Sequence, residues 1–144
     1  MKGCYCLVIR LHDDSTIKIG KRLGKTDFKK GYYVYVGSAM NSLDARLKRH
    51  LSDEKKLHWH VDYLLKNRNS KIADVIYNES SRKIECNLSE SISKKGKGVK
   101  DFGCSDCECD SHLYYFKNKK EAIESIEGAY NSIAMEFHYL KYET

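Results

Sequence analysis

The feature that most constrains the fold is an unbroken run of tyrosine and valine, Tyr32–Val36 (YYVYV), that stands directly before Gly37. Such a run predicts a strand, and the glycine predicts its end. The next stretch has helical spacing, and Asn41 or Ser42 supplies a side-chain oxygen that can cap the first turn. Its apolar residues recur at i, i+4 and i+8, at Leu43, Leu47 and Leu51. A strand that passes directly into an amphipathic helix predicts a mixed fold.

The rest of the chain divides into strands and helices by the same criteria. We expect strands at Cys4–Leu11, Thr16–Gly20, Lys71–Tyr77 and His112–Phe116, and helices at Trp59–Lys66, Ile84–Lys94 and Glu121–Tyr139. Loops are expected in the basic segment Lys25–Lys30 and in Lys95–Asp110. We take 119–142 as an acidic C-terminal helix, in which Gly128 costs about 1 kcal/mol relative to alanine and allows a break. The sequence thus predicts one α/β domain of the α+β type over residues 1–144, with a small, mainly antiparallel sheet flanked by helices.

Charge is distributed unevenly around a net value of +6: residues 18–100 carry 20 Lys or Arg and 9 Asp or Glu, whereas residues 101–144 carry 4 and 9. This pattern suits a polyanionic partner such as nucleic acid, although a lysine-rich solvated surface has the same composition. No stretch approaches the roughly 20 apolar residues that span a bilayer, and the N-terminal run lacks a small-residue cleavage site. We therefore expect a cytoplasmic protein without a membrane partner, whose six cysteines are reduced or bind metal.

Residues that could carry chemistry lie at the end of the Tyr32–Val36 strand and on the helix that follows it. We expect Tyr35, Arg46 and His50 to meet there, at one edge of the sheet. An arginine there suits a phosphodiester, because its planar guanidinium can donate two parallel hydrogen bonds to phosphate oxygens. The segment resembles the GIY-YIG nuclease superfamily, in which Tyr-(Ile/Val)-Gly precedes Arg-Leu-x-x-His on the next helix. Gly3-Cys4-Tyr5 stands where that family has Gly-Ile-Tyr.

The resemblance extends to a largely archaeal branch of that superfamily with uncharacterised members. Four motifs in the right order weigh far more than Tyr-Val-Gly alone. Tyr5 and Tyr35 stand further apart than in typical members, and we interpret the residues between them as an insertion. The added motifs are His58-Trp59-His60-Val61-Asp62-Tyr63-Leu64-Leu65, Glu85-Cys86-x-Leu88 and Phe102-Gly103-x-Ser105-Asp106-Cys107-x-Cys109-x-Ser111-His112-Leu113.

The resemblance implies a three-stranded antiparallel core with extra short strands, and hydrolysis of a phosphodiester assisted by one divalent ion, Mg²⁺ or Mn²⁺. Tyr5 would be the general base, its pKa lowered by nearby cationic charge, and Tyr35 would orient the reacting groups. Arg46 would stabilise charge on the phosphoryl oxygens, and Glu85 would be the sole protein ligand of the ion. His50 would hydrogen-bond to Tyr5 or to phosphate. Each residue type also has an ordinary structural role in a strand or helix.

Two further clusters are candidates for metal. The first offers four zinc ligands in one short loop, although structural zinc sites usually pair ligands across a longer gap. A turn-rich loop with packed thiols is the alternative there. The second, His58-x-His60-x-Asp62, resembles the clustered ligands of metallohydrolases. The alternatives are that the neighbouring side chains anchor this helix, or that the histidines contact DNA. The possible zinc ligands of the first cluster are Cys104, Cys107, Cys109 and His112.

The sequence favours endonucleolytic hydrolysis of DNA, single-stranded or branched, in repair or processing, by a monomer or homodimer. The alternative is a non-catalytic module that binds single-stranded DNA or RNA on a degenerate nuclease fold, with or without a structural zinc. In either case cationic side chains would follow a phosphate backbone, with an affinity that falls as salt rises. The residues expected to contact DNA are Lys48, Arg49, Lys55, Lys56, His58 and His60.

Overall fold

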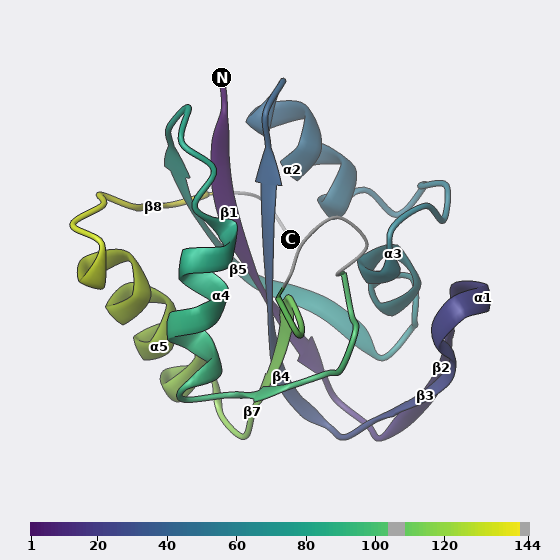
Figure 1. Ribbon diagram of the computed structural model, residues 1–144. Coiled ribbons are helices and arrows are strands. Elements are labelled where there is room, and N and C mark those ends of the chain that lie inside the picture. The colour runs from purple at the N-terminus through teal and green to yellow at the C-terminus, as the bar shows by residue number, and fades with distance from the viewer. Residues whose placement is uncertain (104–108, 142–144) are drawn as a thin grey trace.

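The computed structural model describes residues 1–103 and 109–141, and in it six strands form one antiparallel sheet in the order β6-β7-β4-β1-β5-β8 (Figure 1). The strand β1 lies at the centre, paired with β4 on one side and with β5 on the other. The strands of this sheet are β1 (Gly3–Leu11), β4 (Gly31–Ala39), β5 (Ser70–Glu79), β6 (Lys97–Gly98), β7 (Leu113–Phe116) and β8 (His138–Tyr139). The expected antiparallel core of three long strands with short additional strands is confirmed.

Both faces of the sheet are buried. Alternate side chains of a strand point to opposite faces. Tyr5, Leu7 and Ile9 therefore join one apolar cluster, while Cys4, Cys6 and Val8 join another on the opposite face. Burial on both sides explains why β1 reads as a continuous apolar run rather than as an apolar-polar alternation.

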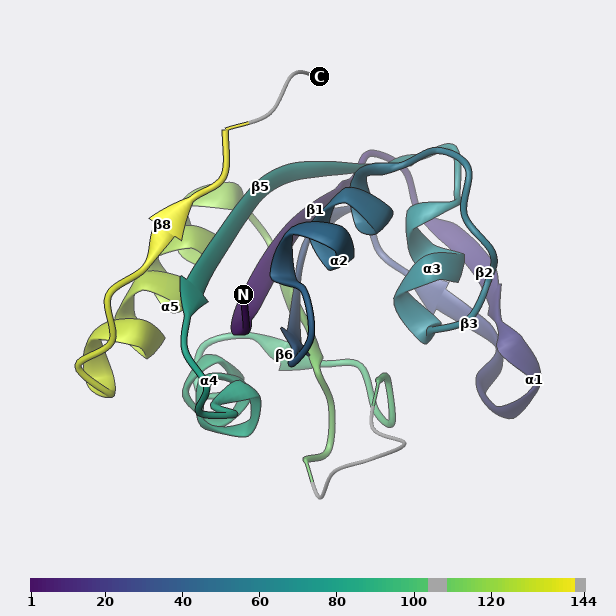
Figure 2. The same cartoon turned by 90° about the horizontal axis from the view of Figure 1, so that it is seen from above.

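Helices cover the two faces in pairs, as Figure 2 shows from above. Residues of α2 and α3 pack into one cluster, and residues of α4 and α5 pack into the other. The first turn of α2 is capped by Ser42, whose side chain accepts a hydrogen bond from the Ala45 N–H at 3.1 Å, as the sequence predicted. The helices are α1 (Gly20–Leu23), α2 (Leu43–Leu51), α3 (His60–Leu65), α4 (Glu85–Ser93) and α5 (Lys119–Ser132).

Residues between β1 and β4 form a hairpin of their own, in which β2 (Ser15–Ile19) pairs with β3 (Gly24–Phe28). The expected loop at Lys25–Lys30 is therefore wrong over its first residues. Its polar side chains alternate outward, while Phe28 is buried in the core. The hairpin accounts for the wide separation of Tyr5 and Tyr35, and its β2 strand contacts α3.

The C-terminal helix is shorter than the sequence predicts. It runs through Gly128 without a break but ends at Ser132, so a helix at 119–142, or one reaching to Tyr139, is wrong. Ala134 has a φ of 51°, and the chain then turns so that Phe137 stacks on Tyr130 with 5.5 Å between ring centroids. The apolar residues beyond the turn pack on the body of the protein and do not continue the helical face.

The segment before β7, expected to be a loop, also contains a strand. The segment Lys95–Asp110 contains the short strand β6, which pairs with β7, and residues 104–108 within it lie outside the described residues. Among the residues that the structure describes, no helix has the length and apolar character needed to cross a bilayer.

Candidate functional site

The candidate site lies where β1 begins and β4 ends. Tyr5 pairs with Gly37 across the two strands, and β4 continues to Ala39 rather than ending at the glycine. A Cβ atom on Gly37 would lie 2.5 Å from the Tyr5 ring and 2.5 Å from its hydroxyl. Gly37 therefore serves less to end the strand than to leave room for the side chain of Tyr5, which crosses over it.

Tyr5 forms a buried hydrogen bond with a residue of α2. Its hydroxyl oxygen lies 2.6 Å from Nε2 of His50, and both side chains are almost wholly buried. Tyr35 completes an aromatic group, because its ring centroid lies 6.4 Å from that of Tyr5 and 6.1 Å from that of His50. Of the two hydrogen-bond partners expected for His50, Tyr5 and phosphate, the structure has the bond to Tyr5.

Burial keeps both members of this pair neutral. It raises the pKa of Tyr5 well above its ordinary value, and the opposing charge and hydrogen bond of Arg46 are smaller effects. Burial also lowers the pKa of His50 to about 3. The expectation that cationic charge lowers the Tyr5 pKa is thus wrong for the net shift, although Arg46 does act in that direction.

Arg46 and Glu85 reach the same end of the sheet from two different helices. The Arg46 Nη1 donates to the carbonyl oxygen of Ser38 at 2.9 Å, and the Ser38 hydroxyl donates to Glu85 Oε2 at 3.1 Å. Glu85 Oε1 lies 3.2 Å from Lys83 Nζ, and only 15% of the Glu85 side chain is exposed. Burial is the main cause of the raised pKa of both Tyr5 and Tyr35, and the Glu85 charge acts in the same direction. Five predicted residues are thus gathered from β1, β4, α2 and α4.

Trp59 makes a contribution that the sequence did not indicate. Its ring centroid lies 4.3 Å from the guanidinium carbon of Arg46 and 4.1 Å from that of Arg49. Cationic groups placed over an indole ring are attracted by its quadrupole. The contact holds two arginines of α2 beside Tyr5 and His50.

Asp62 has a structural role. Both of its carboxylate oxygens accept hydrogen bonds from Arg49, at 3.0 and 2.9 Å, and Oδ2 also accepts from the backbone N–H groups of His58 and Trp59. Burial raises the pKa of Asp62, but these hydrogen bonds outweigh that effect and hold it below its ordinary value. A metal at His58-x-His60-x-Asp62 is not supported, because the Asp62 oxygens are already engaged.

The residues expected to contact DNA fall into two groups. Lys48, Lys56 and His58 are exposed on the side of α2 and α3. The others are engaged in the fold: Lys55 donates to the His50 carbonyl oxygen, and His60 Nδ1 accepts from the Gly103 N–H at 2.9 Å. A groove of about 610 Å³ runs beside the buried His50, and the further cationic side chains of Arg68 and Lys71 line it.

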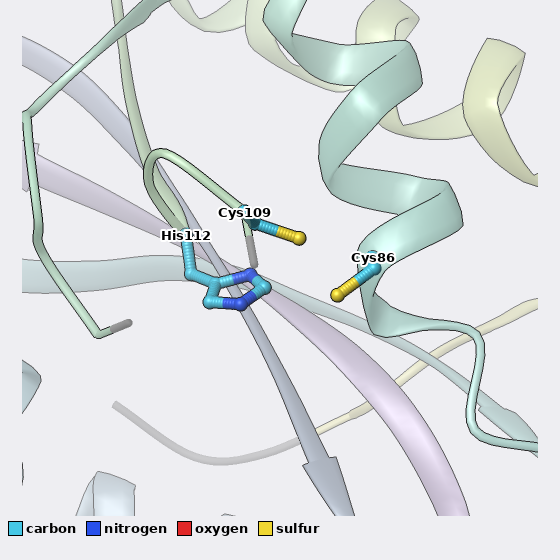
Figure 3. Close-up of side chains that lie close together, drawn as sticks. All are labelled: Cys86, Cys109 and His112. Carbon is cyan, nitrogen blue, oxygen red and sulfur yellow. The ribbon is translucent and has the colours of Figure 1, made fainter. Parts of the chain in front are cut away.

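A second group of side chains lies at the first turn of α4. Cys86 in the first turn of α4, Cys109 and His112 have candidate ligand atoms within 4.8 Å of one another, close enough to hold a metal ion (Figure 3). The sequence indicated Cys109 and His112 but not Cys86, which comes from a distant element. The other two predicted ligands, Cys104 and Cys107, lie outside the described residues.

Comparison with known proteins gives one match. A family model described as a domain of unknown function, DUF123, matches residues 4–135. Neither the curated proteins nor the solved structures contain a match to this chain.

Proposed function

The chain belongs to the DUF123 family, and from that premise we propose that it is a divalent-metal-dependent endonuclease of the GIY-YIG type. Its substrate would be DNA, with single-stranded or branched forms in repair or processing as the preferred class. One observation carries the proposal: Tyr5, Tyr35, Arg46, His50 and Glu85 come from four elements and meet at one end of the sheet.

The Tyr5–His50 pair would supply proton transfer. The His50 imidazole is neutral at physiological pH and can accept a proton, but its pKa of about 3 makes the protonated form costly in the free protein. Tyr5 would take a proton from the attacking water as its own proton passes to His50 across their 2.6 Å hydrogen bond. The raised pKa of Tyr5 makes its phenolate costly in the free protein. We therefore expect proton transfer to be concerted with attack on the phosphodiester.

Arg46 would bind the scissile phosphate. Its Nη1 donates a hydrogen bond to the Ser38 carbonyl oxygen, and its guanidinium stacks on Trp59. The orientation of the guanidinium is therefore fixed before substrate binds. An arginine carries five N–H donors, so one bond to a carbonyl leaves others for phosphoryl oxygens. A donor held in place in this way stabilises developing charge without having to reorganise.

Glu85 would hold the divalent ion. Its carboxylate and the Ser38 hydroxyl present oxygen atoms only, which suits Mg²⁺ or Mn²⁺. One carboxylate is sufficient, because Mg²⁺ keeps several waters and takes its other ligands from substrate phosphate. Lys83 competes for the same carboxylate, but its side chain is 57% exposed and can move into solvent at little cost. The bound ion would provide Lewis-acid stabilisation of the phosphodiester oxygens.

The test is a cleavage assay with single-stranded, duplex, flap and abasic oligonucleotides in Mg²⁺ and in Mn²⁺. We expect cleavage that requires the ion, that is abolished by Glu85→Gln and that falls about 100-fold or more in Tyr5→Phe. Tyr33→Phe is the matched control, because it removes a hydroxyl from another core tyrosine whose hydrogen bond runs to the Lys29 carbonyl oxygen. Glu124→Gln on the exposed side of α5 is the control for charge.

Two results would reject the nuclease. The first is cleavage that survives Glu85→Gln unchanged. The second is tight binding of single-stranded DNA or RNA without cleavage of any substrate in either ion, which would identify the alternative, a non-catalytic binding module.

A further inference from the structure

The second group of side chains, at the first turn of α4, combines two thiols with an imidazole. We propose that Cys86, Cys109 and His112 bind one zinc ion, and that this ion fixes the segment before β7 to the first turn of α4. The proposal does not depend on the nuclease, whose ion would be a hard cation held by oxygen atoms at Glu85.

The chemistry of the donors selects the metal. Thiolate sulfur and imidazole nitrogen are the ligands of zinc, whereas Mg²⁺ and Mn²⁺ prefer oxygen. Zinc–sulfur bonds of about 2.3 Å place the ligands of a tetrahedral ion roughly 3.8 Å apart. The candidate atoms here lie within 4.8 Å of one another, so small side-chain rotations bring them into range. In Figure 3 the Cys86 sulfur points toward the imidazole ring of His112, and the Cys109 sulfur points into the space between that ring and Cys86.

His112 is held in the manner of a metal ligand. Its Nδ1 lies 2.7 Å from the hydroxyl of Ser89, and both side chains are buried. Metal-bound histidines commonly engage their second ring nitrogen in this way, which fixes the orientation of the ring. The backbone of His112 is fixed as well, because it bonds to Phe102 and to Val36.

The surroundings allow an ion to enter and thiol protons to leave. Cys86 and Cys109 are partly exposed and line a cleft of about 940 Å³, whereas Cys4 and Cys6 are sealed in the core. Each thiol releases its proton to solvent as a zinc–sulfur bond forms. These three protein ligands, all among the described residues, together with one water molecule would complete a four-coordinate site.

Such an ion would join two parts of the chain that the Ser89–His112 hydrogen bond already holds near each other. Cys86 lies in the first turn of α4, beside Glu85, while Cys109 and His112 precede β7. Binding of a ligand to the folded state alone stabilises that state. Zinc would therefore raise the melting temperature and hold the N-terminal end of α4 against the sheet.

The first test measures zinc in protein purified without chelator and desalted. We expect close to one zinc per chain, a fall to under about a tenth of that in Cys86→Ser, and no change in Cys6→Ala, a buried cysteine of the central strand. Cobalt(II) added to metal-free protein should give the strong visible bands of a tetrahedral ion with a thiolate charge-transfer band, and Cys86→Ser should lose most of that intensity.

Three outcomes would overturn the proposal. One is a zinc content near zero together with the absence of cobalt bands in reduced protein. Another is zinc that Cys86→Ser and His112→Gln both retain in full. The third is a Cys86–Cys109 disulfide as the native state, seen by mass spectrometry after the thiols of freshly lysed cells are alkylated. Because each readout is independent of cleavage, failure of the zinc site and failure of the nuclease are distinguishable.

Discussion

The Tyr5 hydroxyl lies 2.6 Å from Nε2 of His50 although 45 positions separate the two residues, and the bond is buried. The other ring nitrogen of His50, Nδ1, is buried without a hydrogen-bond partner among the described residues. A buried polar atom of this kind costs about 1–3 kcal/mol, so the pair is not arranged for stability alone. The cost is understandable if the imidazole must receive a proton during catalysis.

The His50 imidazole predicts that stability falls in mild acid. The pKa of His50 is about 3 in the folded protein and has its ordinary value of 6.5 in the unfolded chain. The unfolded chain therefore binds the proton more readily. The contribution of His50 is therefore complete above pH 6.5 and is lost progressively as the pH falls from 6.5 toward 3, by about 1.4 kcal/mol per unit. Urea unfolding followed by the fluorescence of Trp59, the single tryptophan, measures this slope.

Replacement variants separate the effect of His50 from that of other groups. His50→Gln should flatten the dependence of unfolding free energy on pH between 6.5 and 4. His60 and His112 also have pKa values lowered by burial, so a residual slope is expected in His50→Gln. An unaltered slope in that variant would show that His50 is not buried in its neutral form.

Gly37→Ala should be destabilising because of one close contact. The added methyl group would lie 2.5 Å from the Tyr5 ring, so the ring must move and its hydrogen bond to His50 must lengthen. Overpacking of this kind costs about 1–3 kcal/mol, and cleavage should fall with it. Gly128→Ala is the control, since no atom lies within 4 Å of the added carbon and alanine favours a helix by about 1 kcal/mol. Equal effects of the two substitutions would contradict the packing described for Tyr5.

The sequence predicted those elements whose local pattern agrees with their tertiary surroundings. The leucines of α2 and its cap at Ser42 are an example, because spacing and capping are both local properties. The end of α5 could not be predicted, since Phe137 continues the helical spacing but stacks on Tyr130 after a turn at Ala134. Alanine carries no signal for the positive φ that it adopts there.

The candidate sites also combine features that the sequence predicted with features that it did not. The gathering of Tyr5 with Glu85 was expected from the order of family motifs, whereas the stacking of Arg46 on Trp59 and the approach of Cys86 to His112 are tertiary contacts. Spacing along the chain cannot reveal such contacts, because each joins side chains of two elements whose mutual packing the local pattern does not specify. Structural zinc sites usually pair ligands across a long gap in sequence, which disfavoured a site formed by one loop alone. That rule did not identify Cys86 as the ligand outside the loop.

Lys48 provides a test of the proposed nucleic-acid surface. It is exposed on α2, and a phosphate contact there releases one counterion on binding. Lys48→Ala should therefore weaken DNA binding and reduce the slope of log affinity against log salt by about 1. Lys120→Ala, on α5 over the opposite face of the sheet, should change neither quantity. Fluorescence anisotropy with a labelled oligonucleotide at several salt concentrations measures both, and a slope that responds equally to both variants would place the DNA elsewhere.

Arg49 lies on the same helix as Lys48, but its partner gives it a different role. Asp62 is wholly buried and receives two hydrogen bonds from Arg49, whose own side chain is 27% exposed. Arg49→Ala leaves a buried carboxylate without its cation, which costs about 3 kcal/mol, whereas Lys48→Ala should change the unfolding free energy by less than about 0.5 kcal/mol. Arg49→Lys should recover only part of the loss, because an ammonium cannot reproduce the two parallel bonds. Urea unfolding of the three variants tests this order. If Arg49→Ala left stability intact and weakened DNA binding alone, Arg49 would be a phosphate contact and not the structural partner of Asp62.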